Sequence, residues 1–593
     1  MPERCCVSSQ RKGNRELNLK MKDSCTKHRN KKPISKQYKK NRVIEGKYRA
    51  EDSAVCENGI FVGRRQGPVL SFKGIPYALP PVGHLRWKDP VPAAKSSSVY
   101  TAYYYGKSPL QTEWPSETGS LYAKGEDCLT LNIWTNTEGP KEGKTVMVFF
   151  HGGSYGWGAT CDPIYDGFNM VNKFPDLILV TVEYRVGIMG FIDFSIVPGG
   201  EGYRTSGNLG LLDQICALRW VQKNIAAFGG DPGNVTIFGE SAGAGSVSLL
   251  PLMRGSRGLF KRIIAESGSV ALTYSRKECL NLTSLLLKES GCRTMEELTS
   301  LSEEELTLLN EELNDYNNFP ERDNVVLPED LYGAWQDPDL AKIDMLIGTN
   351  ADEVRYWIRE MSYSVDGIPF LSGLRIYMYG MIVMLENNLF ELSGEEKRLV
   401  KKFMARLRRK HIWNVTEYFN EVLFRIPAME QAVRHASAGG KSYTYFWTQR
   451  GANKMIGASH AIELSYIFNN PEEVIYTGNV YNEELADKVQ TMWVNFARTG
   501  DPSLEELCWP PYTPKTRLTM ILGKKVGVVR DLKREQRLLL QPMLHHYFNG
   551  CYSQMSYFVP HTLRMGAAVL GGVATAAAGY SGLFYLFYKH WKE

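Results

Sequence analysis

The sequence contains no CxxC pair and no group of Cys and His at metal-ligand spacing, although its 593 residues include 11 Cys and 10 His. This absence argues against a zinc-binding or CxxC redox domain, and we expect no metal site. No internal repeat is present, which argues against a solenoid. Residues 1–49 have no long apolar stretch, and their longest uncharged run is residues 5–10. We therefore expect no secretory signal peptide.

The net charge is only +6, but basic residues concentrate at the start of the chain. Residues 1–50 contain 16 Lys and Arg against 4 Asp and Glu, with almost no apolar periodicity. We predict that this segment is disordered and solvated. Anionic lipid and nucleic acid are the alternative partners for such a segment. The apolar segment described next favours lipid, and no nucleic-acid partner is expected.

Residues 565–588 form a run of 24 uncharged, mostly apolar or small residues, bracketed by Arg564 and Lys589. At about 1.5 Å per residue, a helix of this length crosses a hydrocarbon core of about 30 Å. Tyr585 and Tyr588 lie near one end, where aromatic rings favour the membrane interface. We predict a transmembrane helix here, with a linker at 549–564 and a short polar tail at 589–593.

Between these segments, strand-like and helix-like stretches alternate. Short β-branched or aromatic runs of the kind found in strands buried on both faces are residues 145–150, 177–183, 235–238, 345–347 and 443–447. Residues 207–228 repeat apolar positions at three- and four-residue steps, as a helix does. Residues 270–330 and 360–440 are typical of helical insertions. The alternation predicts an α/β protein with a large, mostly parallel central sheet flanked by helices.

The chemistry is indicated by residues 235–243 (VTIFGESAG), in which a strand-like run leads directly into GxSxG and then a helix-compatible stretch. In this setting the motif forms a sharp turn that lifts the Ser241 hydroxyl clear of the sheet. The turn also places free N–H groups of the following helix beside a developing negative charge. Ser241 is therefore the candidate nucleophile.

A serine nucleophile needs a base, and the base needs an orienting acid. In the fold that uses this turn, the chain order is Ser, acid, His. Residues 347–353 (IGTNADE) put carboxylates at the end of a short apolar strand, and His460 follows a Gly-containing loop. Upstream, residues 149–156 (FFHGGSYG) are a strand ending in a glycine loop, which can present backbone N–H groups to an oxyanion.

Together these segments resemble the type-B carboxylesterase and cholinesterase family, which has the α/β-hydrolase fold. The resemblance spans about residues 56–548, within a catalytic domain that we place at 51–548. It includes further specific motifs: 72–78 (FKGIPYA), 80–87 (PPVGHLRW), 126–132 (EDCLTLN), 229–233 (GGDPG) and 495–502 (NFARTGDP).

The resemblance assigns a role to individual residues. It implies Ser241 as nucleophile, Glu353 as the acid and His460 as the base. It also implies an oxyanion hole made by three backbone N–H groups, and structural ion pairs within the domain. The oxyanion donors are Gly153, Ser154 and Ala242, and the ion pairs are Arg86–Glu126 and Arg185–Asp213.

Four features depart from the family pattern. Ser154 stands where the family often has glycine, and its Cβ narrows the pocket near the scissile carbonyl. The cysteine that usually pairs with Cys128 is replaced by Ser108. Cys292 has no cysteine in the stretch that follows it, and Cys279 is the irregular substitute partner. Trp114 is displaced from the position of the tryptophan that stacks on choline in cholinesterases. A choline ester is therefore not the favoured substrate.

The resulting prediction is a serine esterase that hydrolyses small carboxylic esters through an acyl-enzyme, without metal or organic cofactor. A cholinesterase is the first alternative. The second is a neuroligin-like adhesion protein, a class that keeps the fold but loses the nucleophile. Retention of all three triad residues argues against adhesion. The sequence leaves the oligomeric state open.

We expect a membrane protein anchored by its C-terminal helix, with the catalytic domain in the cytosol. The lack of an apolar N-terminal segment and the loss of both usual disulfide partners favour this orientation, because a reducing compartment permits unpaired cysteines. The alternative is a lumenal or cell-surface enzyme. Three acceptor sequons for N-glycosylation, at Asn234, Asn281 and Asn414, support that alternative.

Overall fold

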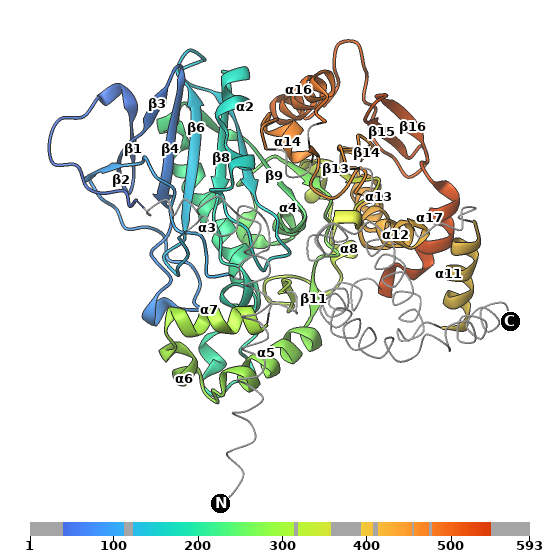
Figure 1. Ribbon diagram of the computed structural model, residues 1–593, viewed down its shortest axis with the longest axis horizontal. Coiled ribbons are helices and arrows are strands. Elements are labelled where there is room, and N and C mark those ends of the chain that lie inside the picture. The colour runs from blue at the N-terminus through green and yellow to red at the C-terminus, as the bar shows by residue number, and fades with distance from the viewer. Residues whose placement is uncertain are drawn as a thin grey trace, which may run out of the picture.

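The computed structural model describes residues 39–111, 123–313, 318–356, 393–406, 413–453, 456–473, 477–478 and 480–546. Within them, one large sheet runs through the molecule and carries helices on both faces (Figure 1). In spatial order its eleven strands are β16 (Gly527–Arg530), β15 (Leu518–Leu522), β14 (Ser442–Trp447), β13 (Asp344–Asn350), β10 (Arg262–Glu266), β9 (Gly230–Glu240), β7 (Lys144–Phe150), β8 (Leu177–Val182), β6 (Thr130–Asn136), β4 (Val69–Pro76) and β3 (Arg64–Gln66).

The centre of this sheet is parallel, as predicted, from β15 through β8. Its edges differ from the prediction, because β16 at one end and β6, β4 and β3 at the other pair antiparallel. The sheet is therefore mixed. Two smaller sheets accompany it: β1 (Ser53–Cys56), β2 (Gly59–Val62) and β5 (Val99–Thr101) form one, and β11 (Tyr274–Ser275) and β12 (Glu321–Arg322) form the other.

The described α-helices are α2 (Phe168–Lys173), α3 (Leu209–Asn224), α4 (Ala242–Leu249), α5 (Arg276–Ser290), α6 (Met295–Ser300), α7 (Glu303–Glu312), α8 (Leu331–Ala334), α11 (Gly394–Arg406), α12 (Trp413–Phe419), α13 (Ile426–Ser437), α14 (Leu464–Ile467), α16 (Glu483–Thr499) and α17 (Arg534–Leu540). A π-helix, η11 (Asn420–Arg425), joins α12 to α13. The region 270–330 carries α5, α6 and α7, as the predicted helical insertion requires, together with β11 and β12.

Side chains of β7 alternate between two cores, because successive residues of a strand point to opposite faces. Val146, Val148 and Phe150 pack in the core covered by α3, α4 and α13. Met147 and Phe149 pack in the core covered by α2, α14 and α16. All five are fully buried. Burying each large side chain contributes about 1.5–3 kcal/mol, so the two cores fix the strand in place.

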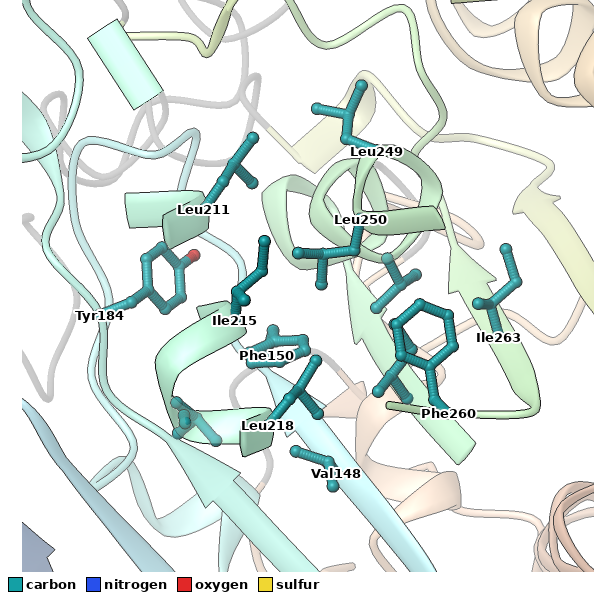
Figure 2. Close-up of a cluster of buried hydrophobic side chains, with 14 of the residues drawn as sticks. Val148, Phe150, Tyr184, Leu211, Ile215, Leu218, Leu249, Leu250, Phe260 and Ile263 are labelled. Atoms are coloured by element: carbon teal, nitrogen blue, oxygen red, sulfur yellow. The ribbon is translucent and has the colours of Figure 1, made fainter. Parts of the chain in front are cut away.

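Figure 2 shows the first of these cores, where Ile215 and Leu218 of α3 lie beside Val148 and Phe150 of β7. The predicted helix at 207–228 is thus α3, extended by a 3-10 turn. Strands β7, β8 and β9 pack against helices on both faces of the sheet. The loops that follow the carboxyl ends of these strands carry the candidate site.

The structured domain begins earlier than the predicted residue 51. The Asn41 side chain donates hydrogen bonds to the carbonyls of Lys73 (2.7 Å) and Tyr104 (2.8 Å), and Val43 forms a β-bridge with Tyr100. The remainder of the predicted basic segment, residues 1–38, lies outside the described residues. So do the predicted linker and the transmembrane helix at 565–588. Among the residues that are described, no helix is both long enough and apolar enough to cross a membrane.

Candidate active site

Ser241 occupies a strained turn between β9 and α4. Its backbone lies in the left-handed region at φ 58°, ψ −118°, which is costly for a residue with a side chain. The two glycines of the motif permit this turn. A Cβ at Gly243 would overlap the carbonyl oxygen of Phe150, and one at Gly239 would press into the backbone of Gly243. The turn leaves Ser241 partly exposed while both of its neighbours are buried.

His460 and Glu353 come together although they are 107 residues apart. His460 Nδ1 lies 2.7 Å from Glu353 Oε2, and both side chains are buried. Glu353 follows β13, and its other oxygen accepts a hydrogen bond from the Asn350 backbone N–H (2.6 Å). A carboxylate only accepts, so the imidazole donates from Nδ1 and directs Nε2 away from Glu353. This is the relation expected of a base and its orienting acid.

The other side of the imidazole faces Glu240, the residue that precedes Ser241. His460 Nε2 lies 3.0 Å from Glu240 Oε1, so this nitrogen faces the carboxyl group of the residue next to Ser241 in the sequence. Burial raises the pKa of Glu240 well above its usual range, and the charges of Glu463 and Glu353 raise that pKa further. A raised pKa favours the neutral carboxyl group, which carries no negative charge.

The candidate oxyanion donors lie in two loops at the same sheet edge. Gly153 has φ 111°, and a Cβ there would overlap the carbonyl of Trp157, so this position requires glycine. Ser154 keeps a left-handed φ of 52° despite its side chain. Ala242 is the first residue of α4, where the backbone N–H has no partner within the helix. Because Ala242 begins a helix and Gly153 has no side chain, backbone N–H groups are the candidate donors at these positions.

Comparison with known proteins identifies the family. A model described as the carboxylesterase family matches residues 52–539. The chain belongs to the carboxylesterase family. It is 34% identical to the para-nitrobenzyl esterase of Bacillus subtilis over 502 residues, which cover 81% of this chain and 96% of that protein. It is also 33% identical to mouse cholinesterase (79% and 82% covered) and 30% identical to mouse neuroligin-2 (84% and 68% covered).

Solved structures of carboxylesterases agree with this assignment. A Geobacillus stearothermophilus carboxylesterase at pH 6.2 superposes with a TM-score of 0.72 at 30% identity, covering 82% of this chain and 99% of its own. A thermophilic pNB esterase gives 0.71 at 29% identity with the same coverage. The fold is thus the α/β-hydrolase fold of carboxylesterases, and the chain is a serine ester hydrolase.

Buried carboxyl groups that no sequence motif indicated lie near the candidate site. Glu463 accepts hydrogen bonds from Asn350 Nδ2 (2.5 Å) and Ser267 Oγ (3.3 Å). Burial, followed by the charge of Glu353, raises the pKa of Glu463 to about 7. Glu266, at the end of β10, accepts from the Trp493 indole N–H (2.6 Å), and burial raises its pKa well above the usual range.

This cluster predicts a pH dependence of stability. Because the pKa of Glu463 rises from 4.5 to about 7 on folding, the folded protein keeps a proton that the unfolded chain has lost. Its stabilising effect is complete below pH 4.5 and is lost as the pH rises through 7. The free energy of unfolding of the wild type should therefore fall between pH 5 and pH 8 by roughly 1–3 kcal/mol more than that of Glu463→Gln.

Denaturant unfolding at the two pH values, followed by circular dichroism, measures this difference. The matched control is Glu484→Gln on the surface of α16, which should show the wild-type pH dependence. Equal pH dependence for wild type and Glu463→Gln would contradict the assignment of a bound proton to Glu463.

Two aromatic rings pack on the imidazole, and they too were missed. The Phe424 ring lies 5.1 Å from the His460 ring, and the Tyr356 ring lies 6.0 Å from it. Phe424 belongs to η11. The first residue of η11, Asn420, forms hydrogen bonds to the turn that carries Glu353. Asn420 Oδ1 accepts from the Val354 N–H (3.0 Å), and its Nδ2 donates to the Ala351 carbonyl (3.0 Å). Single-turn π-helices recur at functional sites, and this one supports both the acid and the base.

The structural ion pairs implied by the resemblance are present. Arg86 donates from Nε and Nη2 to both oxygens of Glu126 (2.7 and 2.5 Å), and Arg185 donates in the same way to Asp213 (2.8 and 2.7 Å). All four side chains are buried, so each pair compensates charges that neither partner could bury alone. Arg185 also donates to the Lys88 carbonyl (2.8 Å) and thereby joins the sheet to a loop.

Cysteines in the described part of the chain form no disulfide. Cys128 and Cys279 are buried and unpaired, and Cys292 is half-buried and unpaired. The position of the usual partner of Cys128 is held by Ser108, whose hydroxyl donates to the Ala123 carbonyl (3.3 Å). Within the described residues, neither Cys128 nor Cys292 is disulfide-bonded, and Cys279 does not pair with Cys292. Among the residues described, no three His, Cys, Asp or Glu side chains gather as metal ligands.

Proposed function

We propose that Ser241, His460 and Glu353 carry out two-step acyl transfer on small carboxylic esters. The observation that carries the proposal is the 2.7 Å contact between His460 and Glu353, with the same imidazole 3.0 Å from the residue that precedes Ser241. In the proposal, His460 is the base that the serine hydroxyl needs, and Glu353 is the acid that orients this base.

In the first step, His460 takes the Ser241 proton as Ser241 Oγ attacks the ester carbonyl. The N–H groups of Gly153, Ser154 and Ala242 bind the oxyanion, and each donor contributes about 2.7–4 kcal/mol to lowering the barrier. His460 then protonates the departing alcohol oxygen as the ester C–O bond breaks. Water attacks the acyl-enzyme by the same route, which releases the acid and restores Ser241.

We propose simple alkyl or aryl esters, rather than choline esters, as substrates. The displaced Trp114, which lies outside the described residues, supports this choice, as does the resemblance to para-nitrobenzyl esterase. The purified full chain should hydrolyse p-nitrophenyl acetate and butyrate with a kcat/KM at least about tenfold above that for butyrylthiocholine. The reverse order would favour the cholinesterase alternative, for which the mouse relative is the supporting observation. No hydrolysis of any ester would favour the adhesion alternative.

We also propose that residues 565–588 anchor the enzyme in a membrane and that the catalytic domain faces the cytosol. The 24-residue uncharged run supports the anchor. The unpaired, buried Cys128 and Cys279 support the cytosolic side, because an oxidising compartment favours disulfides. The lumenal alternative is supported by the sequon at Asn281, which lies exposed on α5. The sequon at Asn234 supports it less, since this side chain bonds to Thr145 and Arg262.

Protease treatment of intact microsomes tests the orientation. A cytosolic domain should be digested without detergent, and glycosidase should leave its mass unchanged. An Asn281→Gln variant is the matched control and should migrate as the wild type does. Protection from protease until detergent is added, with a mass shift on deglycosylation, would contradict the cytosolic orientation.

A further inference from the structure

One carboxyl group, that of Glu183, faces both ends of the loop that carries Gly153 and Ser154. The loop leaves β7 at His151 and reaches Thr160. Glu183 follows the neighbouring strand β8 and is buried. Its Oε1 accepts hydrogen bonds from the Thr160 backbone N–H (2.7 Å) and from Thr160 Oγ1 (2.8 Å). This end of the loop is therefore tied to β8 by two bonds to a single oxygen.

The second oxygen of Glu183 faces the other end of the loop. Glu183 Oε2 lies 3.6 Å from His151 Nε2, and neither atom has a hydrogen-bond partner among the residues that the structure describes. The His151 ring is fully buried and stacks on Tyr184 at 4.4 Å, and Tyr184 Oη donates to the His151 carbonyl (2.7 Å). The imidazole is thus held in one orientation, with its Nε2 edge toward the carboxyl group.

The hydrogen bonds of this pair determine where its protons lie. His151 Nδ1 is 2.8 Å from the Gly152 carbonyl oxygen, which can only accept, so Nδ1 carries a hydrogen. If neither Nε2 nor Oε2 carried one, two lone pairs would face each other inside the protein, without solvent. One proton between these two atoms removes that repulsion, and a small contraction then gives a hydrogen bond.

We infer that Glu183 is a positioning residue for the oxyanion hole, holding Thr160 with one oxygen and sharing a proton with His151 through the other. The inference rests on the proposed oxyanion role of Gly153 and Ser154, which lie between the two fixed ends. It goes beyond that role because the Glu183 side chain, among the described residues, contacts Thr160 and His151 rather than Ser241, Glu353 or His460. Donors aimed at an oxyanion act mainly in the transition state, so a loosened loop should lower kcat and leave KM nearly unchanged.

Two substitutions of Glu183 test its role. Leucine has a similar volume but forms no hydrogen bond, whereas glutamine has a similar volume and can still form hydrogen bonds. Glu183→Leu removes both links, so kcat for p-nitrophenyl butyrate should fall roughly 10–100-fold with KM changed less than about twofold. A trifluoromethyl ketone, whose adduct carries an oxyanion, should bind more weakly by a similar factor. Glu183→Gln should restore kcat to within about threefold of wild type, because its carbonyl accepts from Thr160 and its amide donates to a neutral His151.

Two further variants keep the test decisive. Asp176→Asn breaks the ion pair to Arg498 at the opposite end of β8, about 20 Å away, and should lower Tm without changing kcat. Thr160→Val removes one of the two bonds to Oε1 and should lower kcat severalfold, which tests the inference even if Glu183→Leu does not fold.

A Glu183→Leu protein that keeps the wild-type kcat and ketone affinity would overturn the inference. If that variant does not fold, an unchanged kcat in Thr160→Val would do the same. Fluorophosphonate labelling of the wild type distinguishes failure of the proposed function from failure of the role inferred for Glu183. Absence of label on Ser241 would refute the proposed function, whereas labelled wild type with unaffected variants would refute only the role of Glu183.

Discussion

Replacing Ser241 by Ala is expected to lower kcat for p-nitrophenyl esters by roughly 10⁴–10⁶-fold. Without the hydroxyl no acyl-enzyme can form, and the remaining activity over water would come from the oxyanion donors and substrate binding. Ala is no better suited than Ser to the φ of 58° at this turn, so Tm should stay close to that of the wild type. Steady-state kinetics and thermal unfolding measure the two quantities separately.

The matched control for this change is Ser248→Ala. Ser248 lies on α4, two turns beyond Ser241, is fully buried, and its Oγ has no hydrogen-bond partner in the described part of the chain. This variant should keep the wild-type kcat and the reaction with a fluorophosphonate probe, whereas Ser241→Ala should not be labelled. Equal labelling of both variants would show that another residue is the nucleophile.

The centre of the fold could be predicted from the sequence because strands buried on both faces are continuously apolar. β7, β8 and β13 were found in this way. The antiparallel edge was not found, because β6 carries buried polar residues that interrupt the pattern. Asn132 in β6 is fully buried, and its amide donates to Thr160 Oγ1 (2.9 Å) and Thr181 Oγ1 (3.0 Å). The sequence alone does not show that these hydrogen bonds satisfy the buried amide, because their partners lie in segments distant in the sequence.

The candidate site, too, could be predicted only in part. Ser241 could be predicted because the turn that carries it has a local sequence motif. The glycines at 239 and 243 are part of that motif because a side chain at either position would overlap the neighbouring backbone. Residues that act through partners distant in the sequence leave no comparable local signal. Phe424 reaches His460 from a π-helix, whose extra residue per turn has no sequence signature. Glu183 was included at the end of a predicted strand, but its link to His151 depends on β7 and β8 being neighbours.

Replacing His460 by Ala is expected to lower kcat by several orders of magnitude, with little change in the fold. Without the imidazole, no base removes the Ser241 proton and no acid protonates the departing alcohol. Glu353→Gln should lower kcat roughly 10³–10⁴-fold, because an amide can donate to Nδ1 and so favours the wrong tautomer. The geometry behind both expectations is the 2.7 Å contact between Nδ1 and Glu353 Oε2. Single-turnover measurements with p-nitrophenyl acetate would show both defects in the acylation step.

His435→Gln is the matched control, because His435 is also a buried imidazole but serves a structural purpose. Its Nδ1 lies 2.7 Å from Ser442 Oγ, its Nε2 lies 3.3 Å from the Leu340 carbonyl, and burial lowers its pKa to about 4. Changing it removes hydrogen bonds between α13 and the sheet, so Tm should fall while kcat of the folded protein stays near wild type. If His435→Gln abolished turnover and His460→Ala did not, the base would have to be reassigned. The contact between His460 and Glu353 would then be structural.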